Sequence, residues 1–228
     1  ENRWIMIDAG FSMRQTKERM RMHNVYMKNI SDVLLTHLDR DHFNPAWCRT
    51  LLHMGIAVHL HERHLHRAIR AGLDRSILRP FKSSIEFDTV QIETLHMAHD
   101  ELGTVGFVFT YLDCGNRFGF ATDLGRVPKS LLDTFVKLDV LAIESNYDPT
   151  MQQMSGRPEF LKDRIMGGSG HLSNEESLEA VRRISESSSL KHIVLLHLSR
   201  QCNAPSIIRD LYQTKLAHLD PLLTITDQ

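Results

Sequence analysis

The stretch VLLTHLDRDHF, residues 33–43, decides how the rest of this chain is interpreted. It begins with apolar residues typical of a buried strand, then breaks into two histidines and two aspartates within six residues. Alternate residues after a strand fall on one side of the extended backbone, so His37, Asp39 and Asp41 converge, and a tight turn brings His42 to a neighbouring point. Imidazoles and carboxylates packed this closely are good ligands for divalent metals. The alternative is a polar strand-to-helix loop in which Asp39 or Asp41 caps a helix.

Length and composition indicate one globular domain over residues 1–228. The chain is 42% hydrophobic and 24% charged, which suits a sizeable core. Its net charge of −1 gives no global attraction for nucleic acid or an acidic membrane, so polyanion binding needs a local patch. Three dispersed cysteines, with no signal peptide and no run of about 18 apolar residues, predict a cytoplasmic protein that does not contact a membrane. The first strand-like run begins already at Trp4, so we expect an N-terminal strand pair to be missing from this sequence.

Short apolar strands alternate with helices along the chain. Strands are expected at 4–7, 30–36, 56–60, 85–87, 90–95, 103–112, 117–121, 140–144 and 192–197. Helices are expected at 13–23, from Pro45, at 62–71, 129–138, after Ser173 with a capping box to Glu176, and at 205–216. Residues 148–170 are expected to be rich in loops. This order indicates sheets with helices packed on their outer faces.

Three further polar residues follow predicted strands, namely His99, Asp123 and His197. Each alone is explained as an ordinary polar residue at a strand end. Together with the residues of the opening stretch they make seven candidate metal ligands, and a carboxylate such as Asp123 can bridge two cations roughly 3.5–4 Å apart. By contrast, a second group of histidines straddles a strand and a helix, and we interpret its members as surface or partly buried residues. They are His53, His59, His61, His64 and His66.

The order H-x-D-x-D-H, then His, then Asp after a strand, then His resembles the metallo-β-lactamase superfamily. The usual first motif there is H-x-H-x-D-H, and Asp39 stands where the second histidine is normal. Further segments resemble the YycJ/WalJ-like branch, bacterial cytosolic proteins described as DNA exonucleases and related to RNase Z. These segments are IDAGFS, VLLTH, AHD, VGFVF, FATDLG, IESNYD, GHLSNEE and LLHLSR. The resemblance implies an α+β fold, the four-layer αββα metallo-β-lactamase sandwich.

The same resemblance implies two divalent metal ions and assigns their ligands. The first ion would take His37, Asp39 and His99, the second would take Asp41, His42 and His197, and Asp123 would bridge them. Asp39 makes this set harder and more anionic than usual. We therefore expect the preference to move from zinc toward manganese or iron, although zinc stays possible.

A second pair, Glu144 in IESN and His171 in GHLS, stands in the order of a catalytic pair of the related RNase Z nucleases. A histidine kept protonated by a carboxylate can protonate the leaving oxygen of a phosphodiester. The alternative is a purely structural pair. Gly167, Gly168 and Gly170 before the Ser173 helix suggest a phosphate-binding loop, or simply a flexible one. Lys162, Arg164, Ser199 and Arg200 are weaker candidate phosphate contacts, each more readily interpreted as solvated surface.

The sequence thus predicts a dinuclear metal-dependent hydrolase, a phosphodiesterase or nuclease acting on nucleic acid, with DNA as the expected substrate. A hydroxide bridging the metals attacks phosphorus, with His171, Glu144 and Asp41 as the catalytic residues. The alternatives are a hydrolase of a small phosphodiester, cyclic nucleotide or lactone, and a non-catalytic scaffold with a degraded metal site.

Overall fold

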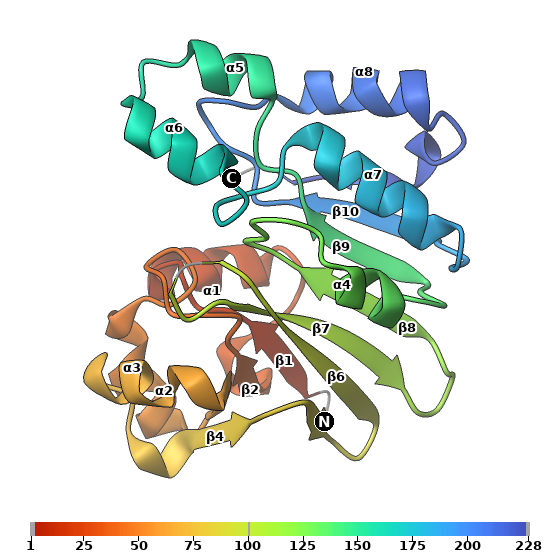
Figure 1. The fold of residues 1–228 in the computed structure, drawn as a ribbon. Coiled ribbons are helices and arrows are strands. Elements are labelled where there is room, and N and C mark those ends of the chain that lie inside the picture. The colour runs from red at the N-terminus through yellow and green to blue at the C-terminus, as the bar shows by residue number, and fades with distance from the viewer. Residues whose placement is uncertain (1–2, 100, 227–228) are drawn as a thin grey trace. The chain divides into compact units, whose positions relative to one another are not determined.

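The computed structural model describes residues 3–99 and 101–226. The chain divides into two compact units, Glu1–Lys82 and Ser83–Gln228. One sheet lies within each unit, and the colours of Figure 1 run from red to yellow through the first unit and on to blue through the second. The α+β class predicted from the sequence is confirmed. The single domain predicted from length stays a prediction, because one domain can also be built from two compact layers.

The first unit contains a four-stranded parallel sheet in chain order. Its strands are β1 (Trp4–Ile7), β2 (Ile30–Leu34), β3 (Ala57–His61) and β4 (Leu78–Phe81). The connections carry α1 (Met13–Arg21), α2 (Cys48–Met54) and α3 (Leu65–Arg70), with short 3₁₀ turns at Met27–Asn29, Pro45–Trp47, Glu62–His64 and Arg75–Ile77. Crossovers between parallel strands are almost always right-handed, and in a sheet in chain order such crossovers place the connecting helices on one face. They share one core with the strands, in which Leu51 of α2 and Ala68 of α3 meet Val33 and Val58.

The second unit contains a seven-stranded mixed sheet, ordered β11-β10-β9-β8-β7-β6-β5. Its strands are β5 (Ser84–Glu86), β6 (Val90–Met97), β7 (Thr104–Tyr111), β8 (Arg117–Ala121), β9 (Val140–Glu144), β10 (His192–Leu196) and β11 (Leu223–Ile225). Strands β5 to β8 pair antiparallel, whereas β8 to β11 pair parallel. Because β6 and β8 are both antiparallel to β7, the strands β6, β8, β9, β10 and β11 all run in the same direction.

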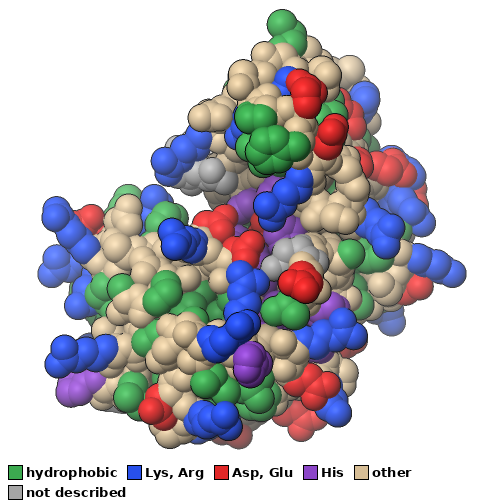
Figure 2. Space-filling view, turned by 60° about the vertical axis from the view of Figure 1, so that its left-hand side comes forward, with side chains coloured by type: hydrophobic (Ala, Val, Ile, Leu, Met, Phe, Trp, Pro, Cys, Tyr) green, Lys and Arg blue, Asp and Glu red, His purple; other side chains and the backbone are tan. Residues whose placement is uncertain are grey.

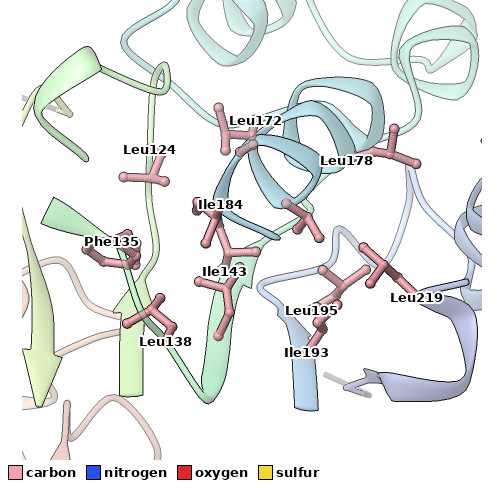
Figure 3. Packing of buried hydrophobic residues seen from close by; sticks show 14 of the residues in the cluster. Leu124, Phe135, Leu138, Ile143, Leu172, Leu178, Ile184, Ile193, Leu195 and Leu219 are labelled. Carbon is pink, nitrogen blue, oxygen red and sulfur yellow. The ribbon is translucent and has the colours of Figure 1, made fainter. Parts of the chain in front are cut away.

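Helices α4 (Lys129–Thr134), α7 (Asn174–Ser185) and α8 (Pro205–Lys215) share one hydrophobic core with this sheet. Every second residue of β9 and β10 enters this core, as alternation in a strand requires. Figure 3 shows Ile184 of α7 near Ile143 of β9, with Ile193 and Leu195 of β10 beside them. The capping box predicted at the start of α7 is confirmed, since Ser173 and Glu176 bond each other's backbone N–H.

The loop predicted at residues 148–170 is wrong in part, because two short helices lie there. They are α5 (Pro149–Met154), capped by Asp148, and α6 (Glu159–Met166). Both are short, and their tertiary packing is carried by a small cluster around Tyr147, Ile165 and Cys202. A six- to eight-residue helix leaves little periodic signal in a sequence, so packing decides its formation. The short strands β4 and β11 and the turn Asp220–Leu222 were also missed.

Within residues 3–99 and 101–226, no helix has both the length and the apolar character needed to cross a membrane.

The pair Asp32–His59 joins β2 to β3. His59 Nε2 lies 2.8 Å from Asp32 Oδ1. Burial is the largest influence and raises the pKa of Asp32, but the hydrogen bonds from His59 and Ser31 and the nearby positive charges together outweigh it, so the net pKa lies below the ordinary value. A lowered pKa contributes stability above the pKa of the unfolded chain, and this contribution disappears as pH falls through the folded value.

We therefore predict that His59→Phe, which keeps a ring but removes the donor, lowers the free energy of unfolding at pH 7 by about 1–3 kcal/mol. The difference from the parent should shrink as pH falls below about 4, where Asp32 first becomes protonated in the unfolded chain, and should disappear once pH falls below the lowered pKa of the folded protein. Urea unfolding at a series of pH values measures both quantities. A difference that stays constant down to acid pH would contradict this role of the pair.

Candidate metal centre

In the first unit, two loops meet at the carboxyl ends of neighbouring parallel strands. Asp8 follows β1, and residues 35–43 follow β2. The loops are tied by backbone hydrogen bonds from Ala9 N to His42 O and from Asn44 N to Ala9 O. Asp8 adopts a left-handed backbone with φ of 59°, which turns its side chain toward the second loop. Neighbouring parallel strands place such residues together at one sheet edge.

The hydrogen bonds of Asp8 and Thr36 set the tautomer of both histidines on this loop. Thr36 Oγ1 donates to Asp8 Oδ2 at 2.8 Å, and its oxygen lies 2.9 Å from His37 Nδ1. His42 Nδ1 lies 2.7 Å from the same oxygen, Asp8 Oδ2. An ionised carboxylate only accepts, and the single hydroxyl proton is already used, so both Nδ1 atoms carry protons. The Nε2 atoms of His37 and His42 then hold the lone pairs that a metal requires.

Two carboxylates face these Nε2 atoms. His37 Nε2 lies 3.9 Å from Asp39 Oδ2, and His42 Nε2 lies 3.7 Å from Asp41 Oδ2. Two ligands of one ion, each about 2.1 Å from it, are roughly 3.4 Å apart in a tetrahedral site. The separations are too long for hydrogen bonds and close to this ligand spacing. The donor set therefore fits a divalent metal.

In the second unit, the polar residues lie at the carboxyl ends of strands that run in the same direction. His99 follows β6, Asp123 follows β8, Glu144 ends β9, and His197 follows β10. Asp123 and His197 both have left-handed backbones, with φ of 55° and 58°. This conformation is uncommon outside glycine, although Asp and His tolerate it better than most residues. Here the left-handed backbone lies just after each strand, where the chain turns the side chain out of the strand direction.

The carboxylate of Asp123 is at the centre of this group. Thr122 Oγ1 donates to Asp123 Oδ2 at 3.0 Å, which leaves Oδ1 facing three histidines. Oδ1 lies 3.9 Å from His99 Nε2, 3.4 Å from His171 Nδ1 and 3.6 Å from His197 Nδ1. Asp123 is only 2% exposed, and a buried charge of this kind requires compensating cationic or hydrogen-bonding partners.

Glu144 forms the shortest contact in the group. Its Oε1 lies 2.6 Å from His171 Nδ1 and 3.3 Å from His197 Nδ1, while Oε2 accepts from Leu124 N at 2.7 Å. Complete burial is the largest influence and raises the pKa of Glu144, but the hydrogen bonds from His171 and His197 and the charge of His171 together hold the net pKa below its ordinary value. The ionised carboxylate fixes the His171 ring through Nδ1, while the imidazole remains about one-fifth exposed.

The glycines before His171 have a packing explanation. A Cβ at Gly170 would lie 2.3 Å from Arg164 O, and one at Gly167 would lie 2.4 Å from Asp163 O. Gly170 O is also 3.1 Å from His99 Nδ1, so this loop holds the His99 ring. Lys162 is buried, with Nζ donating to Gln153 O at 2.8 Å, so its interpretation as solvated surface is wrong. The predicted phosphate-binding role of the loop stays a prediction.

A buried amide network, which the sequence did not indicate, supports the ends of β9 and β10. Asn203 Nδ2 donates to the carbonyl oxygens of Ser145 and Asn146, both at 2.9 Å. Asn146 Nδ2 in turn donates to His197 O at 2.7 Å, and Asn174 Nδ2 donates to Asn203 Oδ1 at 3.0 Å. These bonds join three loops that are distant in sequence. They fix the backbone from which Glu144, His171 and His197 project.

Within each unit, the structure thus brings the predicted residues together. The first unit groups His37, Asp39, Asp41 and His42, and the second groups His99, Asp123, Glu144, His171 and His197. The assignment of the seven ligands to two ions bridged by Asp123 stays a prediction. Asp100, the last residue of the AHD segment, lies outside the described residues.

The sequence did not single out four residues that support the first group. Asp8 and Thr36 contact its histidines, Gly10 packs against the Asp41 backbone, and Arg67 pairs with Asp39. Asp8 follows a strand and could have been found by the rule that identified Asp123 and His197. In the other histidine group, His61 and His64 are buried rather than on the surface. Among the residues that the structure describes, none of that group belongs to a possible metal-ligand cluster.

Comparisons with known proteins identify the family and the fold of this chain. The family described as "Beta-lactamase superfamily domain" matches residues 3–197. Exodeoxyribonuclease YycJ of Bacillus anthracis is 23% identical over 209 residues, which cover 90% of this chain and 78% of that protein. Exodeoxyribonuclease WalJ of Streptococcus pneumoniae is 25% identical over 222 residues, covering 95% and 81%. The resemblance stated from the sequence is confirmed.

Among solved structures, the metallo-β-lactamase fold protein YhfI from Bacillus subtilis aligns with a TM-score of 0.70. The alignment covers 100% of this chain and 85% of that one, at 13% identity. This likeness confirms the predicted fold class.

Gly10 provides a test of how the first donor group, His37, Asp39, Asp41 and His42, is held in place. A Cβ at this position would lie 1.6 Å from Asp41 O and 2.2 Å from Asp41 C, both backbone atoms. We predict that Gly10→Ala displaces the loop that carries Asp41 and His42, lowers the free energy of unfolding by about 1–3 kcal/mol and weakens metal binding. Metal titration and urea unfolding measure the two effects. Gly156→Ala, where nothing lies within 4 Å, is the control, and equal behaviour of the two variants would contradict the prediction.

Proposed function

The chain belongs to the metallo-β-lactamase superfamily, and from this premise we propose that it is a metal-dependent phosphodiesterase that cleaves nucleic acid, with DNA as the substrate. The observation that carries the proposal is the contact of the buried Glu144 with the partly exposed His171, 2.6 Å between Oε1 and Nδ1, beside Asp123. This pair supplies the proton donor that an alkoxide leaving group needs. The two exodeoxyribonucleases to which the chain is similar support the choice of DNA.

We propose that both donor groups are ligand sets for divalent ions, two ions in all, with zinc, manganese or iron as candidates. The ligands would be His37, Asp39, Asp41, His42, His99, Asp123 and His197, of which Asp41 also serves in catalysis. When bound, such ions supply Lewis-acid charge and activate water. The carboxylates among the ligands favour the harder metals of this set, while the imidazoles suit zinc.

His171 is the proposed general acid. Its Nδ1–H donates to Glu144, so a second proton can only be carried at Nε2. The buried carboxylate stabilises the charged imidazolium and orients the ring, as an aspartate does for a catalytic histidine in hydrolases. Donation from Nε2 to the leaving oxygen then yields a neutral alcohol product.

A small phosphodiester, cyclic nucleotide or lactone is the second candidate substrate, because neither the net charge nor the face seen in Figure 2 has a strong basic character. The net charge is −1, and on the face in Figure 2 the Lys and Arg side chains lie at many separate places among acidic and apolar ones. Nucleic acid binding gains much of its affinity from phosphate contacts with clustered basic residues. This candidate is therefore tested in the same experiment.

The experiment is a cleavage assay on end-labelled single- and double-stranded DNA and RNA, with Mn²⁺ and Zn²⁺ in turn. Cyclic nucleotides, a lactone and bis(p-nitrophenyl) phosphate are assayed in parallel. Metal-dependent cleavage of DNA, absent in an Asp123 variant, is the expected result. Turnover of a small substrate without cleavage of nucleic acid would favour the second candidate function. A protein that binds no metal and cleaves nothing would be a scaffold with a degraded site.

We predict that His171→Ala lowers turnover on nucleic acid by roughly 10²–10⁴-fold, the usual contribution of a positioned proton donor. The loss should be far smaller on bis(p-nitrophenyl) phosphate, because its phenolate leaves without a proton. Glu144→Gln should give a similar but milder pattern. His192→Ala, at an exposed position at the start of β10, is the control. Loss of bound metal would instead make His171 a ligand, and equal impairment on both substrates would make it a binding contact.

We predict that Asp123→Asn abolishes activity and weakens metal binding while the protein stays folded. Asparagine is the sharpest replacement because it tolerates the left-handed backbone that Asp123 adopts at φ 55°, whereas alanine adds strain there. Metal content, activity and the thermal midpoint are measured together. The exposed Asp113→Asn in the β7–β8 turn is the control. An active Asp123→Asn enzyme would refute the proposed ligand set.

A further inference from the structure

Asp39 departs from the superfamily's usual histidine, and the structure places Arg67 directly beside it. Arg67 lies in α3, and its Nη2 is 2.6 Å from Asp39 Oδ1. The other oxygen of the same carboxylate, Oδ2, is the one that lies 3.9 Å from His37 Nε2. One oxygen of Asp39 is therefore engaged by the guanidinium, and the other faces the neighbouring candidate ligand.

The neighbouring candidate ligands on this loop are supported in the same way. His37 is held at Nδ1 by Thr36, and His42 is held at Nδ1 by Asp8, so each presents Nε2. Asp39 is held at Oδ1 by Arg67 and presents Oδ2. In each case one polar atom is fixed by a partner from the protein and a single atom is presented. Outer partners of this kind orient metal ligands and set their basicity.

From this pattern we propose that Arg67 is a positioning residue that holds Asp39 as a one-oxygen metal ligand. The inference rests on the proposed metal binding. A histidine offers one nitrogen, whereas a carboxylate offers two oxygens and an additional negative charge. The guanidinium removes both differences, because it occupies the second oxygen and compensates the charge. Arg67 therefore lets an aspartate stand in a position shaped for a histidine.

A contribution to the free energy of unfolding does not explain the Arg67–Asp39 pair well. The side chains of Arg67 and Asp39 are 33% and 29% exposed. Ion pairs with this exposure contribute little to the free energy of unfolding, because water screens the charges and two long side chains lose freedom. An effect on metal binding without a matching effect on stability is thus the distinguishing sign of the proposed role.

The test is a double-mutant cycle on the whole chain, stripped of metal and titrated separately with Zn²⁺ and Mn²⁺ against a chromophoric chelator. Arg67→Met keeps the apolar stem but removes the donor. It should weaken metal binding about 10–100-fold, as loss of an outer partner does. Arg70→Met, at an exposed position on the same helix, is the matched control, expected to change affinity by less than about twofold. In the Asp39→His background, where no carboxylate remains to be held, Arg67→Met should have no effect beyond about twofold.

The other outcomes overturn the proposal. Unchanged or tighter binding by Arg67→Met would mean that the guanidinium is a surface charge or only repels the ion. An equal loss in the Asp39→His background would mean that Arg67 acts through a different group. Thermal midpoints of the metal-free variants check that the fold is intact. If the parent chain itself binds no metal, the proposed function fails as well. By contrast, a metal-binding parent with an unaffected Arg67→Met variant refutes this inference alone.

Discussion

Two buried carboxylates, Asp123 and Glu144, are the constraint on which the second unit depends. They are 2% and 0% exposed, and a charge removed from water to this degree must be compensated. Three histidines, Thr122 and the Leu124 backbone provide that compensation through contacts of 2.6 to 3.9 Å. Replacing one partner would leave a charge unpaired, which costs far more than the lost contact contributes. The buried charges thus explain why so many polar residues converge at one sheet edge.

Strand direction decides where these residues can meet. In the second unit, β6, β8, β9 and β10 run in the same direction although β7 between them is antiparallel, so their carboxyl ends share an edge. In the first unit, parallel pairing of β1 with β2 does the same for Asp8 and the loop at residues 35–43. Left-handed backbones at Asp8, Asp123 and His197 turn the chain at these ends. Strained conformations of this kind persist only where surrounding bonds enforce them, as at functional sites.

The loop at residues 35–43 shows how neighbouring side chains hold an aspartate and two histidines in fixed orientations. Thr36 and Asp8 each hold an imidazole Nδ1, while Arg67 holds one oxygen of Asp39. For His37, His42 and Asp39, the atom left to face the proposed metal site is therefore selected by a hydrogen bond to the other side-chain atom and not by the residue type alone. Asp39 and Arg67 are therefore best considered together, as an ion pair. The chemical character of the loop depends on a residue 28 positions away, on a different element.

The sequence by itself determined most of the strands, the fold class and the family, and it named the polar residues that each unit brings together, because local apolar patterns predict strands and polar residues after them stand out. It also predicted the capping box of α7, where Ser173 and Glu176 are close in the chain. Only the tertiary structure decided the partners. Arg67 beside Asp39, the amide network of Asn203, the packed glycines at 167 and 170, and helices α5 and α6 depend on residues distant in sequence. Short elements and hydrogen-bond partners carry no periodic signal, since packing across the fold, and not local propensity, selects them.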